Sequence, residues 1–98
     1  MFVGDPEITH ISSNVQSFKG DDIILSCSAI SWSTPWSISW KFKSRTLKVT
    51  SVSEKKKSIQ NTLRIKDASL KDAGTYTCNT TGKNGTSEKN VNVVIHGK

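Results

Sequence analysis

Residues 72–78 read Asp72-Ala73-Gly74-Thr75-Tyr76-Thr77-Cys78, and this stretch decides the fold of the 98-residue chain. Its Asp-Ala-Gly start is typical of a corner, because glycine tolerates backbone angles that other residues avoid. Along a β-strand the side chains alternate between two faces, so Tyr76 and Cys78 point one way and Thr75 and Thr77 the other. The stretch therefore predicts a corner that runs into a strand with one dry face.

The rest of the chain shows the same pattern in short alternating runs, separated by turn residues about every 8–12 positions. The predicted inward-facing residues are Ile23, Leu25, Cys27 and Ala29, then Ile38, Trp40 and Phe42, then Leu63 and Ile65, and finally Val91, Val93 and Ile95. Further strands are expected at residues 8–11, 15–18 and 46–53, the last as one strand or two. A charged turn is expected at residues 54–57. We predict an all-β fold, an antiparallel β-sandwich of two sheets.

The sequence also predicts a hairpin at residues 82–85. Asn84-Gly85 is a strong hairpin signal, because both residue types tolerate positive φ angles. The strand that follows this turn would end the sandwich.

Length and composition fit one such domain, spanning residues 1–98 with a core at about residues 5–96. Hydrophobic residues make up 34% of the chain, a low share that suits thin sheets with one wet face each. No apolar stretch approaches the roughly 18 residues that span a bilayer, so no membrane span is expected in this chain. No signal peptide is visible at its start.

Cys27 and Cys78 are the two cysteines of the chain, too few for a four-ligand zinc site. His10 and His96 lie near the termini, where they are poorly placed to complete one. This favours a disulfide, with two buried reduced thiols as the alternative. A bridge would contribute roughly 4 kcal/mol in the chain-entropy model, a large share of a small domain's stability. We expect no metal and no cofactor.

Cys27, Trp40 and the stretch at residues 72–78 together resemble the signature of the immunoglobulin superfamily across nearly the whole chain. The resemblance implies a disulfide between the two sheets, with Trp40 packed against it. It also implies that Tyr76 bonds back to the backbone at the corner between two strands.

The span from Trp40 to Leu63 is short and leaves little room for the two extra strands of a variable domain. The chain is therefore more similar to the I-set or C2 types of the family. It is also loosely similar to modules of vascular endothelial growth factor receptor-type ectodomains and of basigin-like adhesion proteins.

Asp72 is expected to serve the fold and not a reaction. In the family, the Asp at this position pairs with a basic side chain across the bottom of the sandwich, which implies Arg45, Lys48 or one of Lys55 to Lys57 as its partner. Nucleophilic catalysis needs a base within hydrogen-bond reach of a Ser or Cys, and the only histidines are terminal. We expect no enzymatic activity.

Two N-glycosylation sequons occur, Asn79-Thr80-Thr81 and Asn84-Gly85-Thr86. Asn79 follows an inward-facing cysteine, so alternation places it outward, whereas Asn84 is explained equally well by the hairpin turn. We expect a glycan on at least one of them in the native secretory setting. A bulky, hydrated glycan opposes the close packing of an interface, so the sheet face with Asn79 is not expected to be the main partner surface.

The chain is basic, with a formal net charge of +6, and Lys and Arg dominate residues 41–66. Lys41 and Lys43 are predicted in one outward row, with Arg64 and Lys66 in another on the opposite sheet. This charge favours contact with heparan sulfate or another polyanion, and the alternative is a merely solvated surface. No recognition helix or aromatic stacking platform accompanies the charges, so specific nucleic-acid binding is not expected.

Trp32 and Trp36 flank Pro35 in a predicted loop at one end of the sandwich. Tryptophan is enriched among interface hot spots, so both are candidate partner contacts, together with Arg64 and Lys66. The alternative is that one or both tryptophans pack on the end of the core or on a neighbouring domain.

The leading functional hypothesis is an extracellular recognition or adhesion module of a cell-surface receptor or adhesion protein. It would bind a protein partner and stand beside neighbouring immunoglobulin-like domains in the full-length chain. The first alternative is a secreted immune-type protein that binds microbial or glycan (heparin-like) ligands. The second is a structural module of an intracellular filament, which the cysteine pair and the sequons disfavour.

Overall fold

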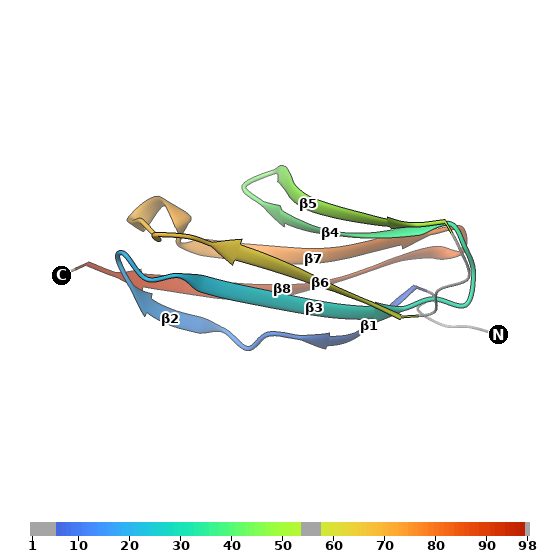
Figure 1. The fold of residues 1–98 in the computed structure, drawn as a ribbon, viewed down its shortest axis with the longest axis horizontal. Coiled ribbons are helices and arrows are strands. Elements are labelled where there is room, and N and C mark those ends of the chain that lie inside the picture. Colours follow the sequence, from blue (N-terminus) through green and yellow to red (C-terminus); the bar gives the residue numbers. More distant parts are fainter. Residues whose placement is uncertain (1–5, 54–57, 98) are drawn as a thin grey trace.

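Two β-sheets face each other in the computed structural model, which describes residues 6–53 and 58–97 (Figure 1). The three-stranded sheet has the order β1-β3-β6, formed by β1 (Glu7–Ile11), β3 (Ile23–Ile30) and β6 (Ser58–Ile65). The five-stranded sheet has the order β2-β8-β7-β4-β5, formed by β2 (Val15–Phe18), β8 (Gly85–His96), β7 (Gly74–Gly82), β4 (Trp36–Phe42) and β5 (Arg45–Val52). The predicted all-β sandwich is confirmed, and the turn expected at residues 54–57 lies outside the described residues.

The core lies between the sheets and is built by the alternation seen in the sequence. The buried residues Ile23, Leu25, Cys27 and Ala29 of β3 face Ile38 and Trp40 of β4, Tyr76 and Cys78 of β7, and Val91, Val93 and Ile95 of β8. Phe42, Leu63 and Ile65 were also expected inward. They are only partly buried and pack against the rim of this core.

One strand pair departs from the predicted antiparallel pattern. β2 pairs with β8 in parallel, from Val15 opposite Val93 to Phe18 opposite His96. The cause is the path of the chain, which leaves the three-stranded sheet after Ile11 and joins the other sheet at Val15.

One strand, β5, lies between β4 and β6 within the described residues, where the sequence left open one strand or two. The short span from Trp40 to Leu63 therefore holds no pair of extra strands in the part that the structure describes. β5 is the last strand of the five-stranded sheet, and β6 is the last strand of the other sheet.

Three turns shape the ends of the sandwich. β4 and β5 are joined by Lys43 and Ser44, with φ angles of 50° and 65°, although the sequence carries no Asn or Gly there. The hairpin predicted at residues 82–85 is confirmed, with Asn84 in the turn between β7 and β8. Gly85 has the expected positive φ, whereas Asn84 does not. At the corner, a 3₁₀ turn η1 (Leu70–Asp72) leads to Gly74, where an added Cβ would lie 3.1 Å from the Phe42 ring.

The molecule is elongated, with extents of 50 × 21 × 20 Å, and the described part of the chain starts and ends at opposite ends of the long axis (Figure 1). The β4–β5 turn and η1 both lie towards the end of the molecule that carries the C-terminus (Figure 1). This end holds the site described next.

Candidate functional site

The two sheets are joined by the disulfide between Cys27 of β3 and Cys78 of β7, with a Cα–Cα distance of 6.4 Å. Trp40 stands opposite Cys78 in the strand register and is fully buried in the same cluster. Its indole Nε1 donates a hydrogen bond of 3.2 Å to the carbonyl oxygen of Asn61, which belongs to the opposite sheet. The expected inter-sheet disulfide is confirmed, and Trp40 is buried in the core opposite Cys78.

Tyr76 holds the corner closed, as the resemblance implied. Its hydroxyl donates a hydrogen bond of 2.7 Å to the carbonyl oxygen of Asp72, and its ring stacks on Phe42 with centroids 4.0 Å apart. Burial raises the pKa of Tyr76 to about 12, with a smaller contribution from the negative charge of Asp72. The neutral phenol is therefore the form that the fold favours.

The ion pair expected for Asp72 is wrong for Arg45 and Lys48, and Lys55 to Lys57 lie outside the described residues. The carboxylate of Asp72 instead accepts hydrogen bonds from the backbone nitrogen of Ser69 at 2.8 Å and from its hydroxyl at 3.4 Å. The physical reason is local, because the 3₁₀ turn places Asp72 three residues after Ser69 and closes a capping box.

The ion pair found within the described residues joins Arg64 to Asp22 at 2.6 Å. Asp22 also accepts a hydrogen bond of 3.0 Å from the backbone nitrogen of Asp67. That hydrogen bond, followed by the one from Arg64, lowers the pKa of the exposed Asp22 carboxyl below its usual value. The pair ties the end of β6 to the start of β3.

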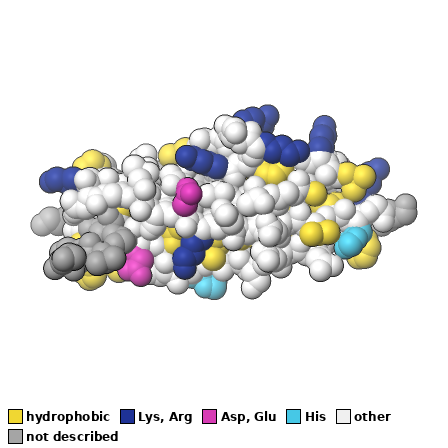
Figure 2. All heavy atoms as spheres, turned by 180° about the vertical axis from the view of Figure 1, so that it is seen from behind, with side chains coloured by type: hydrophobic (Ala, Val, Ile, Leu, Met, Phe, Trp, Pro, Cys, Tyr) yellow, Lys and Arg dark blue, Asp and Glu magenta, His cyan; other side chains and the backbone are white. Residues whose placement is uncertain are grey.

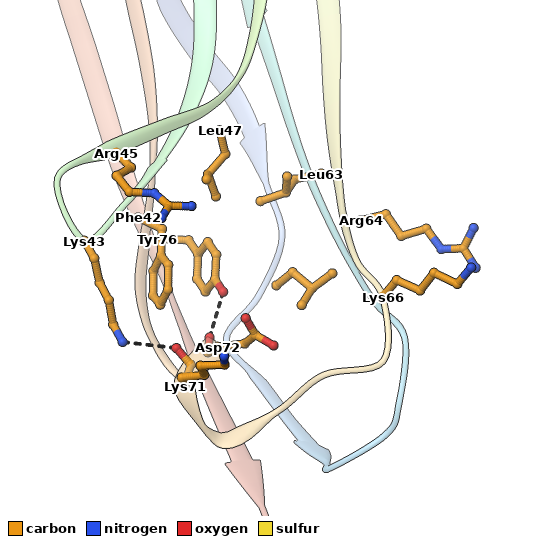
Figure 3. A pocket seen from close by; sticks show the side chains of 11 residues that line it. Phe42, Lys43, Arg45, Leu47, Leu63, Arg64, Lys66, Lys71, Asp72 and Tyr76 are labelled. Carbon is orange, nitrogen blue, oxygen red and sulfur yellow. Dashed lines mark hydrogen bonds between the residues drawn. The ribbon is translucent and has the colours of Figure 1, made fainter.

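A cleft of about 600 Å³ opens at the same end, between the β4–β5 hairpin and the end of β6, with η1 and the start of β7 below it (Figure 3). Its floor is apolar, made by Leu47, Leu63 and Ile65 beside the stacked rings of Phe42 and Tyr76. The cleft exists because β5 and β6 are edge strands of different sheets, so no ladder of backbone hydrogen bonds closes the space between them.

Cationic side chains surround this floor. Lys43, Arg45 and Lys71 lie on the side of the hairpin and η1, whereas Arg64 and Lys66 border the other side with their charged ends pointing away (Figure 3). Lys43 donates a hydrogen bond of 3.1 Å to the carbonyl oxygen of Lys71, and its ammonium lies 5.1 Å from the centre of the Phe42 ring.

The structure thus brings together residues that the sequence predicted in separate rows. Lys43, Arg64 and Lys66 border one cleft, whereas Lys41 lies on β4, on the outer face of the five-stranded sheet. Sequence reasoning did not single out Arg45 or Leu47 as site residues. In the sequence, Arg45 and Leu47 are marked only by their place in the run of positively charged, β-branched and aliphatic residues that follows the turn.

Seen from behind, Lys and Arg side chains gather along one upper edge of the molecule, while much of the remaining face has neither charged nor hydrophobic side chains (Figure 2). Asn79 lies on β7, partly exposed, and its amide donates a hydrogen bond of 3.3 Å to the Thr81 hydroxyl. Asn84 is exposed at the hairpin, with its amide 3.0 Å from the Ser33 hydroxyl. Both sequon asparagines are therefore at the surface.

The two candidate tryptophans differ in position. Trp32 is 54% exposed in the loop before β4. Trp36 is the first residue of β4 and only 3% exposed, so its prediction as a partner contact was wrong. The reason is register, because β4 begins earlier than expected and its alternation turns Trp36 to the same side as Ile38 and Trp40.

Neither a metal-binding group nor a membrane helix was found in the part of the chain that the structure describes. No cluster of three His, Cys, Asp or Glu side chains comes close enough there to hold a metal ion. None of the helices in the described ranges has the length and apolar character needed to cross a membrane.

Comparison with known proteins adds two sequence matches. A family model described as immunoglobulin domain matches residues 5–81. Vascular endothelial growth factor receptor 1 of Gallus gallus is 34% identical in an alignment over 99 residues. The match covers 90% of this chain. The chain spans about 7% of that receptor's length.

Solved structures support the fold. The complex of titin and obscurin-like 1 immunoglobulin domains gives a TM-score of 0.77 at 20% identity, covering 95% of each chain. The Dpr1 and DIP-eta complex gives 0.73 at 20% identity, covering 94% of this chain and 96% of the other. The Sidekick-1 immunoglobulin domains give 0.72 at 21% identity, covering 95% of this chain and 20% of the other. At these identities the similarity concerns the fold alone.

Proposed function

The chain belongs to the immunoglobulin domain family, and we propose that it is an extracellular recognition domain of a cell-surface receptor or adhesion protein. In this proposal it binds a protein partner, catalyses no reaction, and stands beside further immunoglobulin-like domains. The observation that carries the proposal is the 34% identity to a receptor over 90% of the chain.

The disulfide supports an extracellular location. Such bridges form and persist in oxidising compartments and are rare in the cytosol. The Cys27–Cys78 bridge is fully buried in the core, and it would contribute roughly 4 kcal/mol to stability in the chain-entropy model. This argues against the intracellular filament module, although titin domains share the fold.

Three surfaces could contact a partner: the outer face of the five-stranded sheet, the cleft, and the loop that carries Trp32. Glycans on the sequons would cover some of them. A glycan on Asn79 would cover the outer face of the five-stranded sheet, and one on Asn84 would crowd the hairpin at its far end. The Asn84 amide, which would carry the glycan, lies 3.0 Å from Ser33 beside Trp32, so the loop that carries Trp32 stays open only if Asn84 is unmodified. The surface that neither glycan would cover is the cleft with its cationic border.

A second candidate function is a secreted immune-type protein that binds microbial or glycan (heparin-like) ligands. The gathering of Lys43, Arg45, Arg64 and Lys66 at one end of the molecule favours it, because clustered cations attract sulfated polysaccharides. If this holds, the domain stays on heparin at physiological salt, and neutralising Lys43, Arg64 and Lys66 lowers the salt at which it elutes.

Binding of the purified, oxidised domain to intact cells of its source tissue separates the two candidates. We expect saturable binding that is lost when the cells are treated with trypsin and kept when they are treated with heparinase. If heparinase treatment is enough to abolish the binding, the glycan candidate is favoured. Absence of saturable binding to any cell type tested would contradict the recognition function.

The control for this experiment is the same domain after reduction and alkylation of Cys27 and Cys78. It has the composition and charge of the domain but lacks the bridge between the sheets. Binding by this control at the level of the oxidised domain would mean that charge, and not the folded surface, causes the signal.

A further inference from the structure

Side-chain hydrogen bonds join β5 and β6 near the middle of the two strands, and the space between the strands is open at one end. Lys48 donates a hydrogen bond of 2.8 Å from its ammonium to the carbonyl oxygen of Thr62. Asn61 donates from its amide to the carbonyl oxygen of Lys48 at 3.4 Å and accepts from the Thr50 hydroxyl at 3.4 Å. The cleft starts where these contacts stop, towards Leu47 and the β4–β5 turn (Figure 3). Its volume of about 600 Å³ lies within the common range of ligand sites.

The apolar side chains of the cleft floor remain partly in contact with water. Leu47 is 37% exposed, and Phe42, Leu63 and Ile65 are only partly buried. The Phe42 ring of the floor is stacked on Tyr76, 5° from parallel, and the Tyr76 hydroxyl is hydrogen-bonded to the backbone. Covering a partly wet apolar floor with an apolar side chain is favourable, because it removes apolar surface from water.

The charge beside this floor is mostly positive. Arg45 reaches towards the cleft from the start of β5, and Lys43 and Lys71 lie below it (Figure 3). Asp72 is the acid among the described lining residues, and its carboxylate is held by Ser69. A carboxylate at the mouth of the cleft would therefore meet cations, of which Arg45 offers a bidentate hydrogen-bonding geometry.

We propose that this cleft binds an acidic peptide segment of a partner protein, with one aromatic or aliphatic side chain of the segment inserted between Leu47 and the Phe42–Tyr76 stack. The proposal rests on the proposed function and names its partner chemistry. Acidic residues on either side of the inserted side chain contact Arg45, Lys43 and Lys71.

A peptide fits the cleft better than a sulfated polysaccharide. A polysaccharide would use the cations and leave the apolar floor wet, whereas an acidic peptide with an apolar side chain satisfies both. Among the described residues β5 also ends its sheet, so an extended segment beside Leu47 can pair with the backbone of β5 on the turn side of Lys48.

Fluorescence anisotropy with a defined probe tests the proposal. The probe is a fluorescein-labelled pentapeptide with Phe between two pairs of Glu, and the protein is the oxidised 98-residue chain. We expect saturable binding with a Kd below about 1 mM. We expect about tenfold weaker binding when the Phe is replaced by Ala, because the floor is then left wet, and a similar loss when the Glu residues are replaced by Gln.

Two exposed cleft residues give the protein variants, and a third gives the matched control. Arg45→Gln and Leu47→Asn are each expected to weaken the Phe probe about tenfold. Lys41→Gln removes the same charge from β4 outside the cleft and is expected to leave the Kd within about twofold. All three variants should keep the melting temperature of the parent domain.

Three results would overturn the proposal: no saturable binding of the probe, equal binding of the Phe and Ala peptides, or cleft variants that bind like the parent. If a heparin hexasaccharide displaces the probe, and if it binds the Leu47→Asn variant as well as the parent, the cleft is a general polyanion site instead.

The same variants distinguish this proposal from the recognition function. If Arg45→Gln and Leu47→Asn bind cells as well as the parent domain, the cleft is not the partner surface and the recognition function stands. If the peptide binds as expected but the parent domain binds no cell, the cleft chemistry stands and the recognition function fails.

Discussion

Replacing Trp40 by alanine is expected to destabilise the domain by about 3–5 kcal/mol, the usual cost of a large aromatic residue removed from a core. Trp40 has no exposed surface, so the whole indole would leave a cavity beside the disulfide. The change would also remove the hydrogen bond of 3.2 Å from the indole to the carbonyl oxygen of Asn61. Small domains have roughly 5–15 kcal/mol in total, so the variant would be marginally stable.

Two matched variants separate the contributions. Trp40→Phe keeps most of the ring and loses the hydrogen bond across the sheets, for which we expect a loss of about 1–3 kcal/mol. Trp32→Ala removes the same kind of side chain from a position that is 54% exposed, and we expect a loss below about 1 kcal/mol.

Urea denaturation followed by far-ultraviolet circular dichroism measures these differences, because this signal does not depend on tryptophan emission. The m-value should stay constant, so that a change in the midpoint reports a change in stability. A loss below about 1 kcal/mol for Trp40→Ala, or an equal loss for Trp32→Ala, would refute the assignment of Trp40 to the core.

Three further predictions concern the disulfide, the corner and the sequon. Thiol titration of native secreted protein should find no free thiol, and reduction of Cys27–Cys78 should cost roughly 4 kcal/mol; two reactive thiols would contradict both the bridge and the extracellular location. Because the folded-state pKa of Tyr76 is raised from 10.0 to about 12, its contribution to stability is complete below pH 10 and is lost as the pH rises to 12. Tyr76→Phe should lack this loss of stability between pH 10 and pH 12. If both proteins lose stability equally over that pH range, the reasoning is wrong. Mass spectrometry of protein from its native secretory source should find a glycan on Asn79, and an unmodified Asn79 would leave that sheet face free for a partner.

The strands with strict alternation were predictable from the sequence because a buried face imposes a period of two. Ile23 to Ala29 and Val91 to Ile95 are such runs, and the structure buries their inward residues as expected. The corner was predictable for another reason, because Gly74 and Tyr76 each have a physical role that few other residues fill.

The cleft was not predictable, because it depends on how two edge strands from different sheets diverge. Nothing local marks the turn at Lys43 and Ser44, where two residues without a glycine's freedom take positive φ. The burial of Trp36 was missed because Pro35 and the surrounding serines are typical of a loop. The partner of Asp72 was predicted wrongly because its carboxylate closes a capping box with Ser69, three residues earlier, instead of forming an ion pair.

The parallel pairing of β2 with β8 has a mechanical consequence. β2 belongs to the start of the chain and β8 to its end, and the two ends of the molecule are separated along its 50 Å axis (Figure 1). Tension applied through those ends slides the two strands past each other lengthwise. The hydrogen bonds between residues 15–18 and 93–96 are then loaded together and not one after another. The domain would keep its length under force until this short clamp ruptures as a whole, and would act in a longer chain as a stiff spacer.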